Sequence, residues 1–274
     1  MPAEFASAFA AVRDRLPPLG DRISYFHTIG STNDVALTLA AGIDNEGAVV
    51  IAEEQTKGRG RRGRAWFSPP LSGLYVSIVL KPSRARTDPE RATGLLTLAA
   101  GVGLAEAIEE VTGLRAEIKW PNDVLVARRK LAGILAEGVG GDQSGRFADG
   151  ARGGMMVVLG YGINVGLMSP PPDLADRVTS LESELGRPID RAALCAETLA
   201  AISRCYQDLL SGRFDAILDR WRERAPTSRG ARVMWNTSPV PQTGITAGID
   251  DRGALLVRIG DRVERIVAGE LAWL

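Results

Sequence analysis

The stretch EEQTKGRGRRGRAWFSP, residues 53–69, decides the fold because it is a long polar loop between two apolar segments. The preceding segment, residues 47–55 (GAVVIAEEQ), has the composition of a buried strand. The following segment, residues 73–81 (GLYVSIVLK), is a second strand with alternating β-branched residues. The sequence therefore predicts a basic loop whose two ends are both anchored on strands.

Within this loop, residues 57–64 hold five cations and three glycines in eight positions. Glycine allows the backbone to approach a ligand and to point successive N–H groups at one anion. Arginine side chains add bidentate hydrogen bonds to phosphate oxygens. A solvated surface loop is the plain alternative for such a run. The neutral Gln55 before the run, and the aromatic residues Trp66 and Phe67 after it, favour a cradle for a ligand.

The composition is that of an ordinary globular protein without overall basic character. The chain has 274 residues, 45% of them hydrophobic, which predicts one large domain alone or with a small one. Lys plus Arg and Asp plus Glu both number 33, so the net charge is zero, whereas dedicated nucleic-acid binders usually carry a basic excess. No apolar stretch approaches the ~18 residues of a membrane span, and residues 1–16 predict an amphipathic helix rather than a signal peptide. We therefore expect a cytoplasmic protein.

The scarcity of histidine and cysteine excludes several kinds of site. His27 is the only histidine, and no GxSxG context accompanies a serine, so a Ser-His-Asp triad is not expected. Clusters of Cys and His that would hold zinc are absent from the sequence. Cys195 and Cys205 fall in one predicted helix, residues 191–211, about 15 Å apart and too far for a disulfide. We expect both cysteines in the core and His27 partly buried in a structural role.

The order of predicted elements indicates two domains. Residues 1–225 mix strands with helices, and residues 226–274 contain only short strands and tight turns, which predicts a small antiparallel barrel. The sequence STND, residues 31–34, predicts a capping box with Ser31 or Thr32 as the cap of a helix. Residues 140–154 are almost free of apolar side chains and predict a mobile loop. Further helices are expected at residues 89–113 and 214–225 and on both sides of GRPID (186–190).

Three further motifs place polar side chains at strand ends. KWPND, residues 119–123, presents an ammonium, an amide and a carboxylate, a set suited to a nucleotide and Mg²⁺. In RRKLAGIL, residues 128–135, Lys130 opens a strand whose small residues allow close packing of a ligand. GYGINVG, residues 160–166, places Asn164 among glycines. Each motif alone is equally compatible with an ordinary turn.

Together these motifs resemble one family, the biotin–protein ligases. The likeness rests on STND, EEQTKGRGRRGRAWFSP, GLYVSIVLKP, KWPNDVLV, RKLAGILAE, GYGINV, RVTSL and GIDDRGALLV, which follow one another from residue 31 to about residue 270. The resemblance implies an α+β fold, with a mixed β-sheet flanked by helices as in class II synthetase-like ligases and a small C-terminal SH3-like β-barrel. It also implies ATP-dependent biotinylation of an acceptor lysine through biotinyl-5′-AMP, which needs fixed cations but no enzymatic nucleophile.

The resemblance implies roles for individual residues. The expected biotin-binding residues are Ser31, Thr32, Asn33, Gln55, Arg59, Gly60, Arg61, Trp66 and Lys130. The expected ATP-binding residues are Arg61, Arg64, Lys119, Asn122 and Asn164, with Asp123 as a ligand of Mg²⁺. Arg61, Arg64 and Lys130 are the expected catalytic residues. Tyr161 stands where many members of the family have a smaller aliphatic residue, which is a possible change on the adenine side.

The implied partner is the biotin carboxyl carrier protein of acetyl-CoA carboxylase or a related carboxylase. Some members of the family carry an N-terminal DNA-binding module. Only 30 residues precede Ser31, so we expect the ligase-only type without DNA or membrane binding, as a monomer or homodimer. Two alternatives stay open: a lipoate–protein ligase, which shares the acyl-adenylate chemistry, and a non-catalytic nucleic-acid binder that uses the Arg/Gly run.

Overall fold

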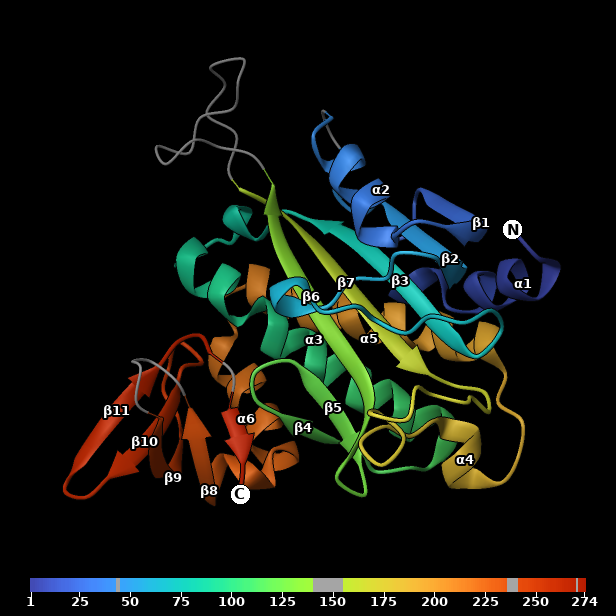
Figure 1. Cartoon of the computed structure of the whole chain (residues 1–274). Helices are drawn as coiled ribbons and strands as arrows, with labels where there is room; N and C mark the ends of the chain where they lie inside the picture. The colour runs from blue at the N-terminus through green and yellow to red at the C-terminus, as the bar shows by residue number, and fades with distance from the viewer. Residues whose placement is uncertain (43–44, 140–154, 236–240, 270) are drawn as a thin grey trace.

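The protein is described here from a computed structural model, which covers residues 1–42, 45–139, 155–235, 241–269 and 271–274. In these residues the chain forms a mixed seven-stranded sheet with helices on both faces, followed by a five-stranded antiparallel sheet (Figure 1). This α+β architecture is the one that the sequence predicted. The predicted mobile loop, residues 140–154, lies outside the described residues.

The large sheet has the strand order β1-β2-β3-β7-β6-β5-β4. Only the β1–β2 pair is parallel; every other neighbouring pair is antiparallel. The strands are β1 (Ile23–Ile29), β2 (Val49–Gln55), β3 (Gly73–Leu80), β4 (Glu117–Lys119), β5 (Asp123–Val126), β6 (Arg129–Val139) and β7 (Met156–Asn164). Strand β3 is buried along its whole length, because it lies near the middle of the sheet and is covered on both faces.

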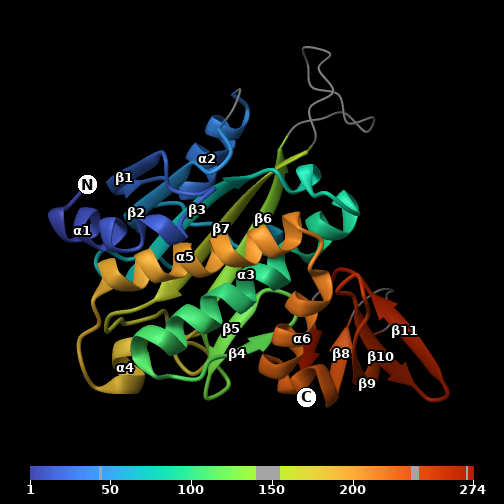
Figure 2. The same cartoon turned by 180° about the vertical axis from the view of Figure 1, so that it is seen from behind.

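Helices of different lengths cover the two faces of this sheet. Two long helices, α3 (Pro89–Thr112) and α5 (Arg191–Leu210), cross one face side by side (Figure 2). The short helix α2 (Thr32–Ala40) lies on the opposite face, over β2, β3 and β7 (Figure 1). The remaining helices are α1 (Ala3–Ala11), α4 (Leu181–Leu185) and α6 (Phe214–Arg224). The face that carries α2 is the one that holds the polar motifs.

Helix α3 is long and apolar enough to cross a membrane by composition, although the sequence showed no uninterrupted apolar run of that length. In the fold, 72% of this apolar window is buried inside the molecule. Its small residues, such as Gly101 and Gly103, face Ile118 and the backbone of α5 at Ile202, so the helix packs closely against its neighbours. We therefore assign α3 as the core helix of the large domain.

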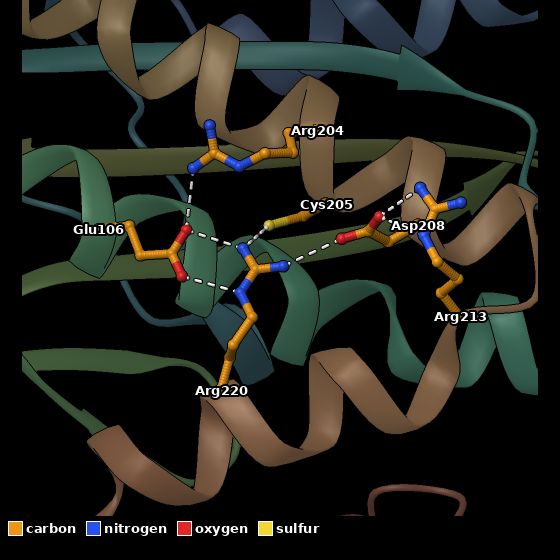
Figure 3. A network of polar contacts seen from close by, with 6 residues as sticks. All are labelled: Glu106, Arg204, Cys205, Asp208, Arg213 and Arg220. Atoms are coloured by element: carbon orange, nitrogen blue, oxygen red, sulfur yellow. Dashed lines mark hydrogen bonds and ion pairs between the residues drawn. The ribbon is translucent and has the colours of Figure 1, made fainter.

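A network of charged residues joins α3, α5 and α6 beneath the sheet (Figure 3). Arg220 on α6 donates to Glu106 on α3 at 2.7 and 2.8 Å, and Arg204 on α5 donates to the same carboxylate at 2.9 Å. Burial raises the pKa of Glu106, but the hydrogen bonds from these two arginines outweigh it, so the pKa lies below its usual value. Arg220 also lies 3.2 Å from the Cys205 sulfur. The network ties the helix that precedes the C-terminal sheet to the core.

The five C-terminal strands form an antiparallel sheet of order β11-β10-β9-β8-β12. They are β8 (Arg229–Trp235), β9 (Gln242–Ile249), β10 (Leu255–Ile259), β11 (Arg262–Ile266) and β12 (Leu271–Trp273). This sheet is consistent with the predicted SH3-like module, although within the described residues no pairing joins the two edge strands into a closed barrel. The module packs beside β4 and α6 (Figure 1).

Two local predictions were wrong in part. Ser31 is the N-cap residue of α2, but its side chain makes no capping hydrogen bond. The amide of Thr32, the first residue of the helix, donates instead to Gln55 Oε1 at 2.8 Å, so a side chain from strand β2 satisfies a terminal amide that a capping box would leave open. His27 is not partly buried: its side chain is 82% exposed, because β1 is the edge strand, and it contacts Glu53 at 3.0 Å.

Candidate functional site

A cavity on the α2 face of the large sheet collects side chains from five separate segments of the chain. Its lining includes all nine residues that the family resemblance assigned to biotin: Ser31, Thr32, Asn33, Gln55, Arg59, Gly60, Arg61, Trp66 and Lys130. Asn122, from the group assigned to ATP, is also there. The cavity measures about 50 Å³, well below the roughly 300 Å³ at which small-molecule sites begin. The side chains that line the cavity therefore fill most of the space between them.

Polar groups at the start of α2 are fixed by strand residues. Gln55 Oε1 accepts hydrogen bonds from the Thr32 amide at 2.8 Å and from the Thr32 hydroxyl at 3.1 Å. The Ser77 hydroxyl, fully buried on β3, lies 2.8 Å from Thr32 Oγ1 and 2.5 Å from Asn33 Oδ1. Gln55 Nε2 donates to Ser68 Oγ at 3.1 Å, which ties the strand end to the loop. These bonds hold the polar wall in one arrangement.

Glu137 on β6 joins this wall to the basic loop. Its Oε2 accepts a hydrogen bond from Asn33 Nδ2 at 2.7 Å and one from Arg59 Nη2 at 2.8 Å. Arg59 also lies 2.9 Å from the Asp34 carboxylate. Asn33 can therefore present a fixed orientation, since its oxygen faces Ser77 and its nitrogen faces Glu137. In this structure Arg59 is bound by two carboxylates.

Three glycines make room for the side chains that line the cavity. A Cβ atom on Gly160 would lie 2.0 Å from Asn33 Oδ1, and one on Gly162 would lie 2.4 Å from Trp66 Nε1. A Cβ atom on Gly133 would lie 2.7 Å from the Trp66 ring. Trp66 thus rests directly on the glycine backbone of β6 and β7.

Lys130 is positioned from two sides. Its Nζ lies 2.7 Å from Asp123 Oδ1 and 5.1 Å from the centre of the Trp66 ring. Its backbone amide donates to the Arg177 carbonyl at 2.8 Å, and its carbonyl accepts from the Thr179 amide at 2.9 Å. The RVTSL segment therefore anchors the backbone while Asp123 orients the ammonium. This arrangement places one positive charge at the cavity.

A second positive charge comes from the basic loop. Arg61 Nη1 donates to Asn122 Oδ1 at 2.8 Å. Asn122 is held in turn by the β6 backbone, because its Nδ2 donates to the Ile134 carbonyl at 2.9 Å. Arg61 and Lys130, which are 69 positions apart in the sequence, thus line the same cavity. Two fixed cations at one cavity can bind two anionic groups or stabilise negative charge that develops between them.

Other predicted residues lie outside the lining of this cavity. Arg64 is exposed on the loop, and Lys119 lies over the Trp273 ring of the C-terminal sheet at 5.5 Å. Asn164 is buried, and its Nδ2 donates to the Thr179 carbonyl at 2.9 Å, which gives it a structural partner near Lys130. Tyr161, by contrast, is among the residues that line the cavity, although its hydroxyl bonds Thr198 on α5 at 2.9 Å, so the end of its side chain lies on the opposite face of the sheet.

Few side chains among the described residues are placed to bind a metal ion. Asp123 directs its carboxylate at the Lys130 ammonium, and within the described ranges no group of three His, Cys, Asp or Glu side chains could hold a metal. Mg²⁺ sites usually combine one or two carboxylates with substrate phosphates and water. The protein groups present do not by themselves form a Mg²⁺ site, and the ion pair favours a positioning role for Asp123.

Sequence reasoning missed Ser77 and Glu137. Ser77 stands within an apolar strand, and an interior polar residue there was a signal that a hydrogen-bond partner exists. Glu137 closes the quoted motif RKLAGILAE, but its partners lie 78 and 104 residues away in the sequence. Neither partner can be inferred from local spacing.

Comparisons with known proteins bear on the family and the fold. Residues 25–147 match the biotin/lipoate A/B protein ligase family. The chain is 33% identical to the bifunctional ligase/repressor BirA of Bacillus subtilis, over 92% of this chain and 74% of that protein. It is 31% identical to the biotin–[acetyl-CoA-carboxylase] ligase of Mycobacterium tuberculosis, over 96% of this chain and 98% of that protein. The solved biotin protein ligase from Aquifex aeolicus, in complex with biotin and ATP, superposes with a TM-score of 0.76 at 27% identity, covering 93% of this chain and 99% of that chain.

Proposed function

The chain belongs to the biotin–protein ligase family, and from that premise we propose that it is a biotin–[acetyl-CoA-carboxylase] ligase. It uses ATP to activate biotin as biotinyl-5′-AMP and then transfers biotin to a lysine of the carrier domain of a carboxylase. Relatives named for this activity, and neighbours solved with biotin and ATP, support the assignment. The observation that carries it in this chain is the single cavity that unites the nine residues assigned to biotin.

The polar and apolar walls of the cavity suit the two ends of biotin. Thr32, Asn33 and Gln55 offer an ordered set of donors and acceptors for the ureido ring, and Ser31 lies at the same wall. Trp66 supplies an apolar surface for the body of the ligand. We assign Arg61 and Lys130 to the biotin carboxylate and the α-phosphate of ATP, because both line the cavity together with Arg59 and Gly60.

The first step joins two anions, and therefore depends on these cations. A carboxylate oxygen of biotin attacks the α-phosphorus, the bond from that phosphorus to the bridging oxygen breaks, and pyrophosphate leaves with the electron pair. Arg61 and Lys130 offset the repulsion between the reactants and stabilise the charge of the transition state. In the second step the unprotonated amine of the acceptor lysine attacks the acyl carbon, and AMP leaves. Positioning of the reactants supplies the rest of the acceleration.

Ligand entry requires a change at the loop. The cavity of about 50 Å³ cannot hold biotin while Trp66 and Lys130 rest over Gly133 and Gly162. Biotin can therefore enter only when the Trp66 side chain leaves the glycine backbone of β6 and β7. We propose that the loop of residues 57–66 orders over the ligand once it is bound.

The residues assigned to ATP differ in how far the structure supports the assignment. Asn122 bonds Arg61 and lines the cavity, which supports its assignment. Arg64, Lys119 and Asn164 do not line the cavity as it stands, and their assignment to ATP rests on the family resemblance. ATP is delivered with Mg²⁺ in most enzymes that transfer its phosphoryl or adenylyl groups; the phosphates of ATP and water would hold that ion, and the ion pair with Lys130 assigns Asp123 to positioning the ammonium rather than to the metal.

We also propose the domain boundaries, the acceptor and the oligomeric state of the enzyme. We place the catalytic domain at residues 1–225 and the C-terminal module at residues 226–274. The acceptor is a biotin carboxyl carrier domain, which implies a cytoplasmic site of action. The enzyme acts as a monomer or homodimer, without DNA or membrane as a partner.

One assay tests the proposal. The protein is incubated with ATP, biotin and a biotin carboxyl carrier domain, and the mass of the carrier is measured. The expected result is a mass increase of one biotinyl group, with release of pyrophosphate that depends on biotin. Lipoate in place of biotin should give no product. Modification by lipoate alone would assign the chain to the other branch of the biotin/lipoate family.

A further inference from the structure

Glu137 on β6 lies behind the cavity of the candidate site and contacts two of the residues that line it. Glu137 itself is not among the lining residues, and its side chain is 25% exposed. One oxygen of its carboxylate, Oε2, accepts a hydrogen bond from Asn33 Nδ2 at 2.7 Å and another from Arg59 Nη2 at 2.8 Å. Glu137 therefore acts on a bound ligand through Asn33 and Arg59.

A chain of hydrogen bonds leads from Glu137 along the polar wall to Gln55. The Ser77 hydroxyl lies 2.5 Å from Asn33 Oδ1 and 2.8 Å from Thr32 Oγ1. The Thr32 hydroxyl donates in turn to Gln55 Oε1 at 3.1 Å. Thr32, Asn33 and Ser77 are all buried, so these groups satisfy most of their hydrogen bonds with one another.

The acceptor at the end of this chain decides which way the Asn33 amide faces. A carboxylate offers acceptors only, whereas a carboxamide has an oxygen acceptor and a nitrogen donor. With Asn33 Nδ2 towards Glu137, Asn33 Oδ1 is left to accept from the Ser77 hydroxyl. A flipped amide would place its oxygen against the Glu137 carboxylate, as two buried acceptors without a hydrogen atom between them. Glu137 therefore excludes the flipped orientation.

Arg59 holds the carboxylate of Glu137 in place. The Arg59 guanidinium donates to the same Oε2 atom and also lies 2.9 Å from the Asp34 carboxylate on α2. Hydrogen bonds between charged groups of this kind are roughly twice as strong as those between neutral groups. Because Arg59 and Asn33 both line the cavity, Glu137 keeps a residue of the basic loop and a residue of the polar wall in one arrangement.

The orientation of Asn33 matters for a ligand whose hydrogen bonds have a fixed direction. The ureido ring of biotin carries one carbonyl acceptor between two N–H donors. A flipped Asn33 would exchange a donor for an acceptor at the wall, and a site whose buried polar groups are mismatched to a ligand rejects that ligand strongly. In 2-iminobiotin a nitrogen replaces the ureido oxygen, and this nitrogen is a donor when protonated. The two ligands therefore report on the donor and acceptor pattern of the wall.

We propose that Glu137 is a specificity-determining positioning residue, which sets the donor and acceptor pattern of the polar wall through Asn33 and thereby selects the ureido group. This inference rests on the proposed function, because it takes biotin as the ligand. A glutamine in place of Glu137 has nearly the same shape but includes a donor, so either orientation of Asn33 finds a partner. In the flipped form the new amide donates to Asn33 Oδ1, and Asn33 Nδ2 donates to the Ser77 oxygen. Selectivity for the ureido group then falls, although every residue of the cavity lining is still present.

The test compares Glu137→Gln with wild type, with Glu137→Asp and with Glu197→Gln. Glu197 is a matched control because its carboxylate is 20% exposed, also accepts from an arginine, Arg15 Nη1 at 2.8 Å, and is not among the lining residues. The dissociation constants of biotin and of 2-iminobiotin are measured by calorimetry at pH 7 without ATP, and their ratio is the readout. We expect Glu137→Gln to reduce the preference for biotin by about tenfold, the scale of one hydrogen bond in a buried site. Glu197→Gln should leave the preference within about twofold of wild type.

The Glu137→Asp variant separates the donor and acceptor pattern from the geometry. Aspartate keeps a group that only accepts hydrogen bonds, but its stem is one methylene shorter, so the contact with Asn33 becomes longer. Both ligands should therefore bind more weakly, while the preference for biotin stays within about twofold of wild type.

The outcomes distinguish the inference from the proposed function. An unchanged preference in Glu137→Gln, including an equal loss of affinity for both ligands, would show a purely structural role and overturn the inference alone. A preference lowered by about tenfold in Glu137→Asp would also overturn it, and this second comparison remains if Glu137→Gln does not fold. A wild-type protein that binds no biotin would refute the proposed function, and the inference with it.

Discussion

The Lys130 ammonium lies 2.7 Å from the Asp123 carboxylate at the edge of the cavity that unites the predicted biotin residues. The two residues belong to different motifs, KWPND and RKLAGIL, on adjacent antiparallel strands. A lysine is flexible along its four-carbon stem, and this ion pair gives the ammonium one preferred position before substrates arrive. The catalytic proposal for Lys130 can therefore be tested apart from the positioning proposal for Asp123.

Replacing Lys130 by alanine should lower the rate of biotin-dependent ATP–pyrophosphate exchange by about 100-fold or more, the scale of losing one electrostatic stabiliser. The fold should persist, because the side chain is partly exposed and its backbone contacts remain. Lys57→Ala, an exposed lysine that does not line the cavity, is the control and should keep the wild-type rate. An unchanged rate in the Lys130 variant would remove that residue from the mechanism.

Asp123→Asn should lower kcat by roughly tenfold without changing the concentration of Mg²⁺ that gives half-maximal rate. The reason is that the ion pair with Lys130 is lost, while an asparagine oxygen still accepts a hydrogen bond. The rate is measured across a titration of Mg²⁺ at saturating biotin and ATP. A strong increase in the Mg²⁺ requirement would instead show that Asp123 contacts the metal.

Gly160→Ala should weaken biotin binding by about tenfold or more. The new Cβ atom would lie 2.0 Å from Asn33 Oδ1 and would displace a side chain that Ser77 and Glu137 hold in place. Overpacking of this kind also costs about 1–3 kcal/mol of folding free energy. Gly138→Ala is the control, since its nearest neighbour is a flexible methionine sulfur at 3.5 Å. Calorimetry of biotin binding to both variants makes the comparison, and equal affinities would contradict the assigned role of Asn33.

The Glu106 network should make stability fall in acid. Burial alone would raise the pKa of Glu106, but Arg220 and Arg204 lower it below the unfolded value of 4.5. A carboxyl group with a lowered folded-state pKa stabilises the protein above the unfolded pKa, and that contribution is lost as pH falls through the folded pKa. Urea unfolding at pH 7 should show Glu106→Gln to be less stable by about 2 kcal/mol. The difference in unfolding free energy between wild type and Glu106→Gln should become smaller below pH 4.5. A difference that stays constant with pH would contradict the lowered pKa of Glu106.

The two cysteines should not react with thiol reagents in the folded protein. Burial raises the pKa of Cys195 to about 12 and that of Cys205 to about 11. Because the thiolate is the reactive form, an aromatic disulfide reagent at pH 8 should label neither cysteine until denaturant is added. Rapid labelling of one thiol without denaturant would show that the helix carrying it opens locally.

The sequence by itself determined the chemistry of the site. The Gly/Arg run between two strands, together with Lys130, indicated two anions held by fixed cations, and the predicted biotin residues do line one cavity. Strand and helix positions followed from hydrophobic patterns that act over a few residues, so most elements were predictable. Errors arose where a distant partner acted in place of a local one: the Ser31 side chain makes no capping bond, and Gln55 on β2 instead accepts from the Thr32 amide at the start of the helix.

Only the tertiary structure decided which distant residues hold the site residues in place and which cavity adjoins the site. Glu137 meets Asn33 across 104 residues of sequence, and Trp120 meets Gly253 across 133. Neither pair can be inferred from spacing, because strand register and helix packing decide which faces meet, and both depend on how the whole core closes. The same closure brings Arg252 and Arg265 next to Arg61 and forms a second cavity beside the first. Local sequence thus sets which groups are available, and the packing of the core sets their distances.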